Sequence, residues 1–140
     1  MTITSPPSAE RWFKRILWIG IFANLALAIP TLLMPAMMMQ LTNLPAASPL
    51  LWPRFAALLL ILLSTFYMPA AIDPNRYRLV AWLAVISRLV GFVFFVLLQS
   101  SEYHLLGYFD LVFFLPEAVL LWRLPAVGSV PVVTGAGAGR

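Results

Sequence analysis

Four long apolar segments separated by short polar stretches dominate the pattern of hydrophobic and polar positions along the chain. They cover about residues 16–33, 55–71, 79–98 and 105–122. Each approaches the roughly 20 residues that an α-helix needs to cross about 30 Å of hydrocarbon. Strands of a membrane barrel alternate apolar and polar residues, and this alternation is absent. Helices are therefore the remaining structure that satisfies the hydrogen bonds of the backbone in lipid. The pattern predicts an all-α, four-helix transmembrane bundle.

The remaining segments complete the predicted organisation. The transmembrane domain spans residues 16–123, and the connections within it are short enough to make consecutive spans antiparallel neighbours. Residues 1–15 form a short N-terminal segment, and residues 124–140, rich in Gly, Ala, Val and Pro, are predicted to be a disordered tail. The longer, uncharged connection over residues 35–53 is predicted to lie in the membrane interface.

Composition agrees with this class of protein and excludes several others. Of the 140 residues, 62% are apolar and 10% are charged, against about 25% charged residues in a typical soluble domain. There is no cysteine, which excludes disulfides and thiolate metal sites, and a single histidine excludes a bis-histidine haem within this chain. We predict no cofactor.

Charge predicts an orientation. Lysine and arginine number nine against five acidic residues, and most of them flank the same ends of the spans. That side carries Arg11, Lys14, Arg15, Arg76, Arg78, Arg123 and Arg140, whereas the other side carries Arg54. Because positive residues remain in the cytoplasm, both termini are predicted to be cytoplasmic. The basic residues form no patch interleaved with aromatic ones, so nucleic acid is not a predicted partner.

Ionisable residues inside the spans are the candidate site, because charge within a bilayer is costly and usually faces the bundle interior. From a rise of about 1.5 Å per residue, Arg88 and Glu117 lie at similar depth in the cytoplasmic half. Arg54 and Asp110 lie at similar depth in the outer half. Each pair is predicted to form an ion pair. Every span contributes one residue to a polar layer in the cytoplasmic half, namely Asn24, Ser64, Arg88 and Glu117.

Two interpretations of this layer remain open. The residues either form satisfied ion pairs that hold the helices in register, or they line a binding or proton-handling site. Both need the same residues at the same spacing.

The sequence also contains candidate ligands for a metal ion. Thioether and imidazole ligands suit Cu(I), and the candidate ligands are His104, Met37, Met38 and Met39. Methionines also fill apolar gaps, so we predict no metal. No phosphate-binding loop, catalytic triad or His-Glu-x-x-His motif occurs, which favours a non-catalytic protein.

The passage Tyr67–Arg78, followed by Ser87-Arg88-Leu89-Val90-Gly91, resembles the DoxX-like group of small four-helix bacterial inner-membrane proteins. Members of that group often have a tyrosine before a short Asp-Pro turn and a basic residue inside the third helix. The resemblance implies a multi-pass protein of the bacterial inner membrane. Since some members are partners of membrane oxidoreductases, it also implies an accessory role.

Three functions follow as hypotheses. The first is a non-catalytic accessory or assembly subunit of a larger, respiratory or redox, membrane complex, with other membrane subunits as partners. The second is a small transporter or binder in which Arg88 and Glu117 line a cavity for an anionic or lipid-like substrate. The third is an enzyme acting on a lipid or quinone. Its candidate acid–base residues are Glu117 and His104, but they are predicted on opposite sides of the bilayer and cannot cooperate.

Overall fold

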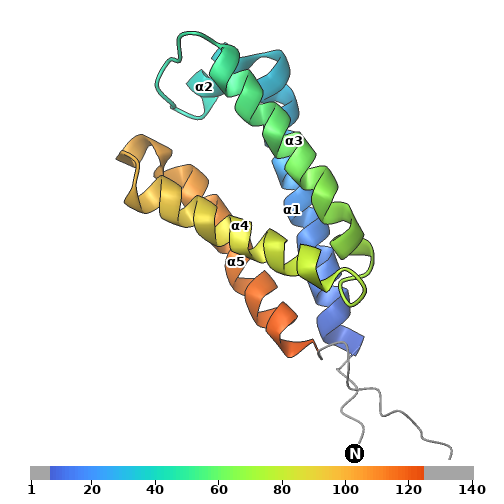
Figure 1. Ribbon diagram of the computed structural model, residues 1–140. Coiled ribbons are helices and arrows are strands. Elements are labelled where there is room, and N and C mark those ends of the chain that lie inside the picture. The colour runs from blue at the N-terminus through green and yellow to red at the C-terminus, as the bar shows by residue number, and fades with distance from the viewer. Residues whose placement is uncertain (1–6, 125–140) are drawn as a thin grey trace, which may run out of the picture.

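The computed structural model describes residues 7–124, and most of them are helical. In chain order the elements are α1 (Pro7–Leu33), α2 (Pro35–Leu41), α3 (Leu51–Ile72), α4 (Arg78–Leu97), the short 3-10 helix η1 (Ser101–Tyr103) and α5 (His104–Arg123) (Figure 1). Within the described residues, α1, α3, α4 and η1–α5 are long and apolar enough to cross a membrane. The prediction of an all-α chain with four candidate membrane-spanning helices is confirmed.

The first helix begins earlier than predicted, at Pro7 instead of residue 16. Ala9, Phe13 and Leu17 recur every four residues and are buried along one face, while Glu10 and Lys14 form an ion pair one turn apart. Hydropathy excluded this segment because of its charges, although its apolar face packs in the core. At the other end, Leu124 was assigned to the tail but is buried. The rest of the predicted tail and residues 1–6 lie outside the described residues.

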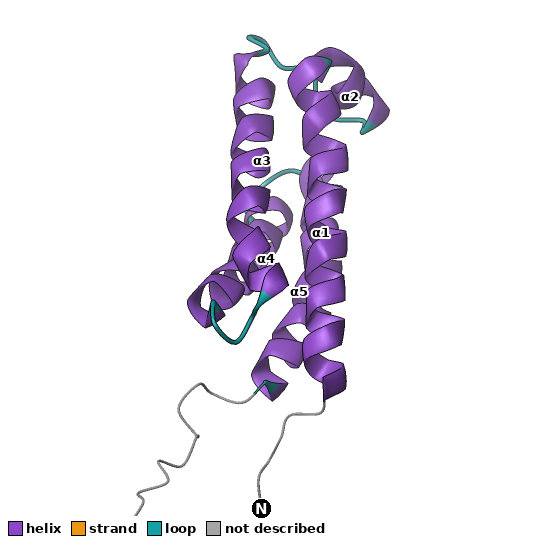
Figure 2. Cartoon of the chain, turned by 90° about the vertical axis from the view of Figure 1, so that its right-hand side faces the viewer, coloured by secondary structure: helices purple, strands orange, loops and turns teal. Residues whose placement is uncertain are grey.

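The four long helices form two antiparallel hairpins. Helix α1 packs chiefly on α3, and α4 packs chiefly on α5 (Figure 1). The hairpins meet through α1 against α5 and α3 against α4, so that α3 and α5 lie diagonally across the bundle. Figure 2 shows α1 and α3 running side by side, with α2 at the end of the bundle away from Pro7. This arrangement decides which side chains can meet.

The two hairpins pack tightly at one end and diverge at the other. The closed end comprises residues 7–21, 67–85 and 117–124, and it holds most of the buried apolar core. Alanines there, at positions 70, 71, 81 and 84, allow the helices to approach closely. The open end comprises residues 24–60 and 95–110, where α2 packs beside α1. The outer surface is apolar all round, as contact with lipid requires, and includes Ile19, Phe22, Leu59, Phe66, Leu83, Val90, Leu97, Val112 and Val119.

Candidate functional site

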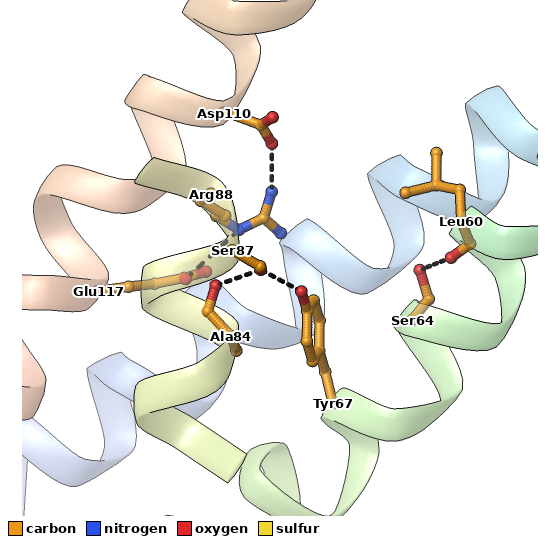
Figure 3. A network of polar contacts seen from close by, with 8 residues as sticks. All are labelled: Leu60, Ser64, Tyr67, Ala84, Ser87, Arg88, Asp110 and Glu117. Atoms are coloured by element: carbon orange, nitrogen blue, oxygen red, sulfur yellow. Dashed lines mark hydrogen bonds and ion pairs between the residues drawn. The ribbon is translucent and has the colours of Figure 1, made fainter. Parts of the chain in front are cut away.

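Arg88 of α4 lies at the centre of the bundle, between two carboxylates of α5. Its side chain is 2% exposed. Its Nη1 donates a hydrogen bond to Asp110 Oδ1 at 3.3 Å, and its Nε lies 3.4 Å from Glu117 Oε2 (Figure 3). Asp110 and Glu117 are seven residues apart, which places them two turns apart on one face of α5. The structure therefore brings Arg88 and Glu117 together, and it adds Asp110 to make an ionic cluster of three residues.

The predicted pair of Arg54 with Asp110 is wrong. Asp110 binds Arg88, whereas Arg54 lies exposed in the first turn of α3. Two physical reasons account for this. Helix α3 is diagonal to α5, and Arg54 lies on the exposed face of α3, whereas the neighbouring Trp52 and Pro53 line the same cavity as Asp110. In addition, η1 lengthens the helical segment before Asp110, which moves the carboxylate deeper than a count from residue 105 suggested.

Two glycines make room for the ionic cluster. A Cβ on Gly91 of α4 would collide with the Asp110 carboxylate, and a Cβ on Gly20 of α1 would collide with Arg88 Nη2. The ring of Phe113 covers the guanidinium from α5, with Arg88 Cζ 4.7 Å from its centroid. This is within the range of a cation–π contact. Gly20 and the ring of Phe113 thus pack against the guanidinium, and Gly91 makes room for the Asp110 carboxylate that binds it.

The polar groups of the ionic cluster are only partly satisfied. Glu117 is fully buried, and within the described residues neither of its carboxylate oxygens accepts a hydrogen bond. Arg88 Nε is near Glu117 at ion-pair distance without hydrogen-bond geometry, and Arg88 Nη2 has no acceptor among the same residues. Buried groups of this kind are expensive, which points to a reason other than stability for keeping them.

A second group of polar residues joins α3 to α4 at the same level. The hydroxyls of Tyr67 and Ser87 form a hydrogen bond, and Ser87 Oγ donates to the carbonyl of Ala84 at 2.8 Å (Figure 3). Ser64 is fully buried, but its hydroxyl bonds to the Leu60 carbonyl of its own helix. Sequence reasoning missed Tyr67 and Ser87. The signal was present, because Tyr67 is one turn after Ser64 and Ser87 precedes Arg88.

A cavity of about 440 Å³ lies between the hairpins at the open end. Its walls are almost entirely apolar. The deepest lining residues on α1, α3 and α5 are Asn24, Leu60 and Asp110, and we call these three the floor. Its upper lining includes Ala28, Thr31, Met38, Met39, Trp52, Ala57, Phe95, Tyr103 and Phe109. A cavity of this size with few polar groups at one end is typical of a site for a small lipophilic molecule.

The cavity lining includes one of the four residues of the predicted polar layer. All four are buried, but only Asn24 lines the cavity, while Arg88, Glu117 and Ser64 lie outside its lining. Arg88 and Glu117, which we expected to line a cavity, are absent from the lining of this one, and the carboxylate among its described lining residues is that of Asp110. Asn24 is 4% exposed, and within residues 7–124 its amide has no hydrogen-bond partner. Its polar group is available to a bound molecule.

The candidate metal ligands do not converge on the cavity. Met38 and Met39 line it, but Met37 is half exposed and His104 packs edge-on against the ring of Tyr108. Among the residues that the structure describes, no group of three or more His, Cys, Asp or Glu residues is placed to hold a metal ion.

Comparisons of the chain with protein-family models, with curated proteins and with solved structures found no match.

Proposed function

We propose that this membrane protein binds a small lipophilic molecule with a polar head in the cavity between its two helical hairpins. The observation that carries the proposal is the floor of the cavity. An apolar chamber of about 440 Å³ ends on Asn24 and Asp110, which offer an unpartnered amide and a carboxylate. Apolar walls retain the body of such a molecule, and the few polar groups fix its orientation.

The location of the protein is part of this proposal. The resemblance to the DoxX-like group supports a bacterial inner membrane. An orientation with both termini in the cytoplasm is supported by Lys14, Arg76 and Arg123, which belong to the closed end. In that orientation the cavity lies in the outer half of the bilayer.

An accessory role in a larger membrane complex stays a prediction beside this proposal. The two roles are compatible, because a subunit of a redox complex can hold a lipophilic cofactor of that complex in the same cavity. They differ in whether other subunits accompany the protein through purification in a mild detergent.

Filling the floor tests the binding function. In Leu60→Trp the larger ring enters the cavity, whereas in the matched variant Leu59→Trp it projects from the lipid-facing surface, where Leu59 is 48% exposed. Each purified protein is extracted with organic solvent, and the extract is analysed by mass spectrometry. We expect a lipophilic compound from the wild type and from Leu59→Trp, and a strongly reduced amount from Leu60→Trp.

The same preparations provide the contrary outcome. Equal compound recovery from all three proteins, at equal folded yield by gel filtration, would show that the molecule is bulk lipid on the outer surface. Co-purified subunits that remain in all three would support the accessory role without the cavity.

A further inference from the structure

The ionic cluster carries one negative charge more than it can balance internally. Arg88 supplies one positive charge, and Asp110 and Glu117 supply two negative charges when both are ionised. The other charged residues of the described part lie towards the ends of the helices or in the turns. An uncompensated charge inside the bilayer is costly, so one further positive charge, a proton or a bound cation, belongs to the resting cluster.

The cavity opens on the acidic side of the cluster. The Asp110 side chain is 21% exposed and lines the floor, while Arg88 is enclosed by its carboxylates, by Gly20 and by Phe113. A molecule in the cavity therefore meets a carboxylate and not the guanidinium. This arrangement disfavours an anionic head group and favours a cationic one.

Two further observations point to a cation. The aromatic side chains of Trp52, Phe95, Tyr103 and Phe109 line the walls, and aromatic rings attract desolvated cations through their faces. The nearly buried amide of Asn24 lies at the floor without a partner among residues 7–124, and its oxygen is suited to accept from an ammonium group or to face a positive charge.

We propose that the cavity binds a lipophilic monocation, of the ammonium or phosphonium class, whose charge replaces a proton at Asp110. This inference rests on the proposed binding function and names the class of ligand. No bond other than that to the proton breaks. The cation enters, the proton leaves to water, and the charge of the site is unchanged.

Few other groups can take part in this exchange. From α4, Arg88 faces Asp110, and from α5, Glu117 lies on the same stripe. Helix α3 contributes Tyr67, whose hydroxyl is bonded to Ser87, and Tyr103 lines the same cavity. Helices α1 and α2 contribute uncharged lining residues. The exchange is therefore expected to involve one proton per cation.

The test uses two probes of the same shape and opposite charge, tetraphenylphosphonium and tetraphenylborate. Binding of radiolabelled tetraphenylphosphonium to the full chain is measured by equilibrium dialysis in a mild non-ionic detergent, with protein-free micelles as the blank. We expect saturable binding of tetraphenylphosphonium, and no saturable binding of tetraphenylborate when it is dialysed separately, because the two ions would pair in a mixture. Because one proton is displaced, the affinity should rise with pH by up to about tenfold per pH unit, and should level off once Asp110 is ionised in the unliganded protein.

Variants assign the effect to Asp110. Asp110→Asn preserves the size of the side chain and is expected to lose about tenfold or more in affinity, together with the pH dependence. Asp110→Glu, which retains the charge, is expected to restore both. Glu102→Gln is the matched control, because it removes an exposed carboxylate outside the cavity lining at the open end, and should bind as the wild type does. Gel filtration and circular dichroism establish that each variant is folded.

Four outcomes would overturn the proposal. Saturable binding of tetraphenylborate in its own dialysis, or unchanged binding of tetraphenylphosphonium in folded Asp110→Asn, would remove the selectivity for a cation. If tetraphenylphosphonium fails to bind but Leu60→Trp still loses its extracted compound, the ligand is not a lipophilic cation. The proposed binding function would then remain in place. Failure of both experiments would remove the binding function itself.

Discussion

Replacing Arg88 with methionine is expected to destabilise the protein by about 3–5 kcal/mol, the loss that follows when one partner of a buried ion pair is removed. Methionine has a similar length and suits an apolar interior, but it leaves Asp110 and Glu117 as buried carboxylates without a counter-charge. The free energy of unfolding, measured by denaturant titration in mixed micelles, gives the magnitude.

The matched control is Arg54→Met, which makes the same substitution at the exposed mouth of α3. A change within about 0.5 kcal/mol is expected there. Adding Asp110→Asn and Glu117→Gln to Arg88→Met should recover most of the stability, because the buried charges are then gone. A triple variant as unstable as Arg88→Met would mean that arginine acts by filling space. Equal stability of Arg88→Met and Arg54→Met would contradict the buried cluster altogether.

Gly91→Ala is expected to cost about 1–3 kcal/mol, the usual range for adding volume to a packed interior. The new methyl group would occupy the position of the Asp110 carboxylate, which its bond to Arg88 holds in place. Either the carboxylate leaves the guanidinium or α4 moves away from α5. The same unfolding titration gives the cost.

Val90→Leu is the control for Gly91→Ala, because it adds one carbon to the neighbouring residue on the lipid-facing surface of the same helix. It should change stability by less than about 0.5 kcal/mol. If Gly91→Ala changed the free energy of unfolding as little as Val90→Leu, this would contradict the close approach of α4 to Asp110.

Much of this architecture could be predicted from elementary rules. Long apolar runs in a chain with so few charges require membrane helices, and polar residues within them must face inward. Asn24, Ser64, Arg88 and Glu117 are accordingly all buried. Depth along neighbouring helices also sufficed to pair Arg88 with Glu117, since α4 and α5 are consecutive and antiparallel.

The remaining features depend on information that a one-dimensional pattern lacks. Pairing Arg54 with Asp110 by depth ignored which helices are neighbours, and α3 and α5 turn out to be diagonal. The start of α1 was misplaced because hydropathy measures affinity for lipid, whereas Phe13 is buried against other helices. The cavity arises because the hairpins diverge at one end, and no residue type encodes a crossing angle by itself.

The reactivity of single cysteines at two positions of the polar layer distinguishes an open cavity from a packed interior. The 140 residues contain no cysteine, so no background reaction occurs. Asn24→Cys places the thiol at the cavity floor, and Ser64→Cys places it in the packed interior outside the cavity lining. Methyl methanethiosulfonate, a small uncharged reagent, is applied to both folded variants, and modification is followed by mass spectrometry.

An open cavity predicts that the cysteine at position 24 reacts about tenfold faster or more than the cysteine at position 64, because access governs the rate for two otherwise similar thiols. Bound tetraphenylphosphonium should slow the faster reaction. Equal protection of both thiols would mean that the polar residues form a packed layer that only joins the four helices, and would contradict a ligand site between the hairpins.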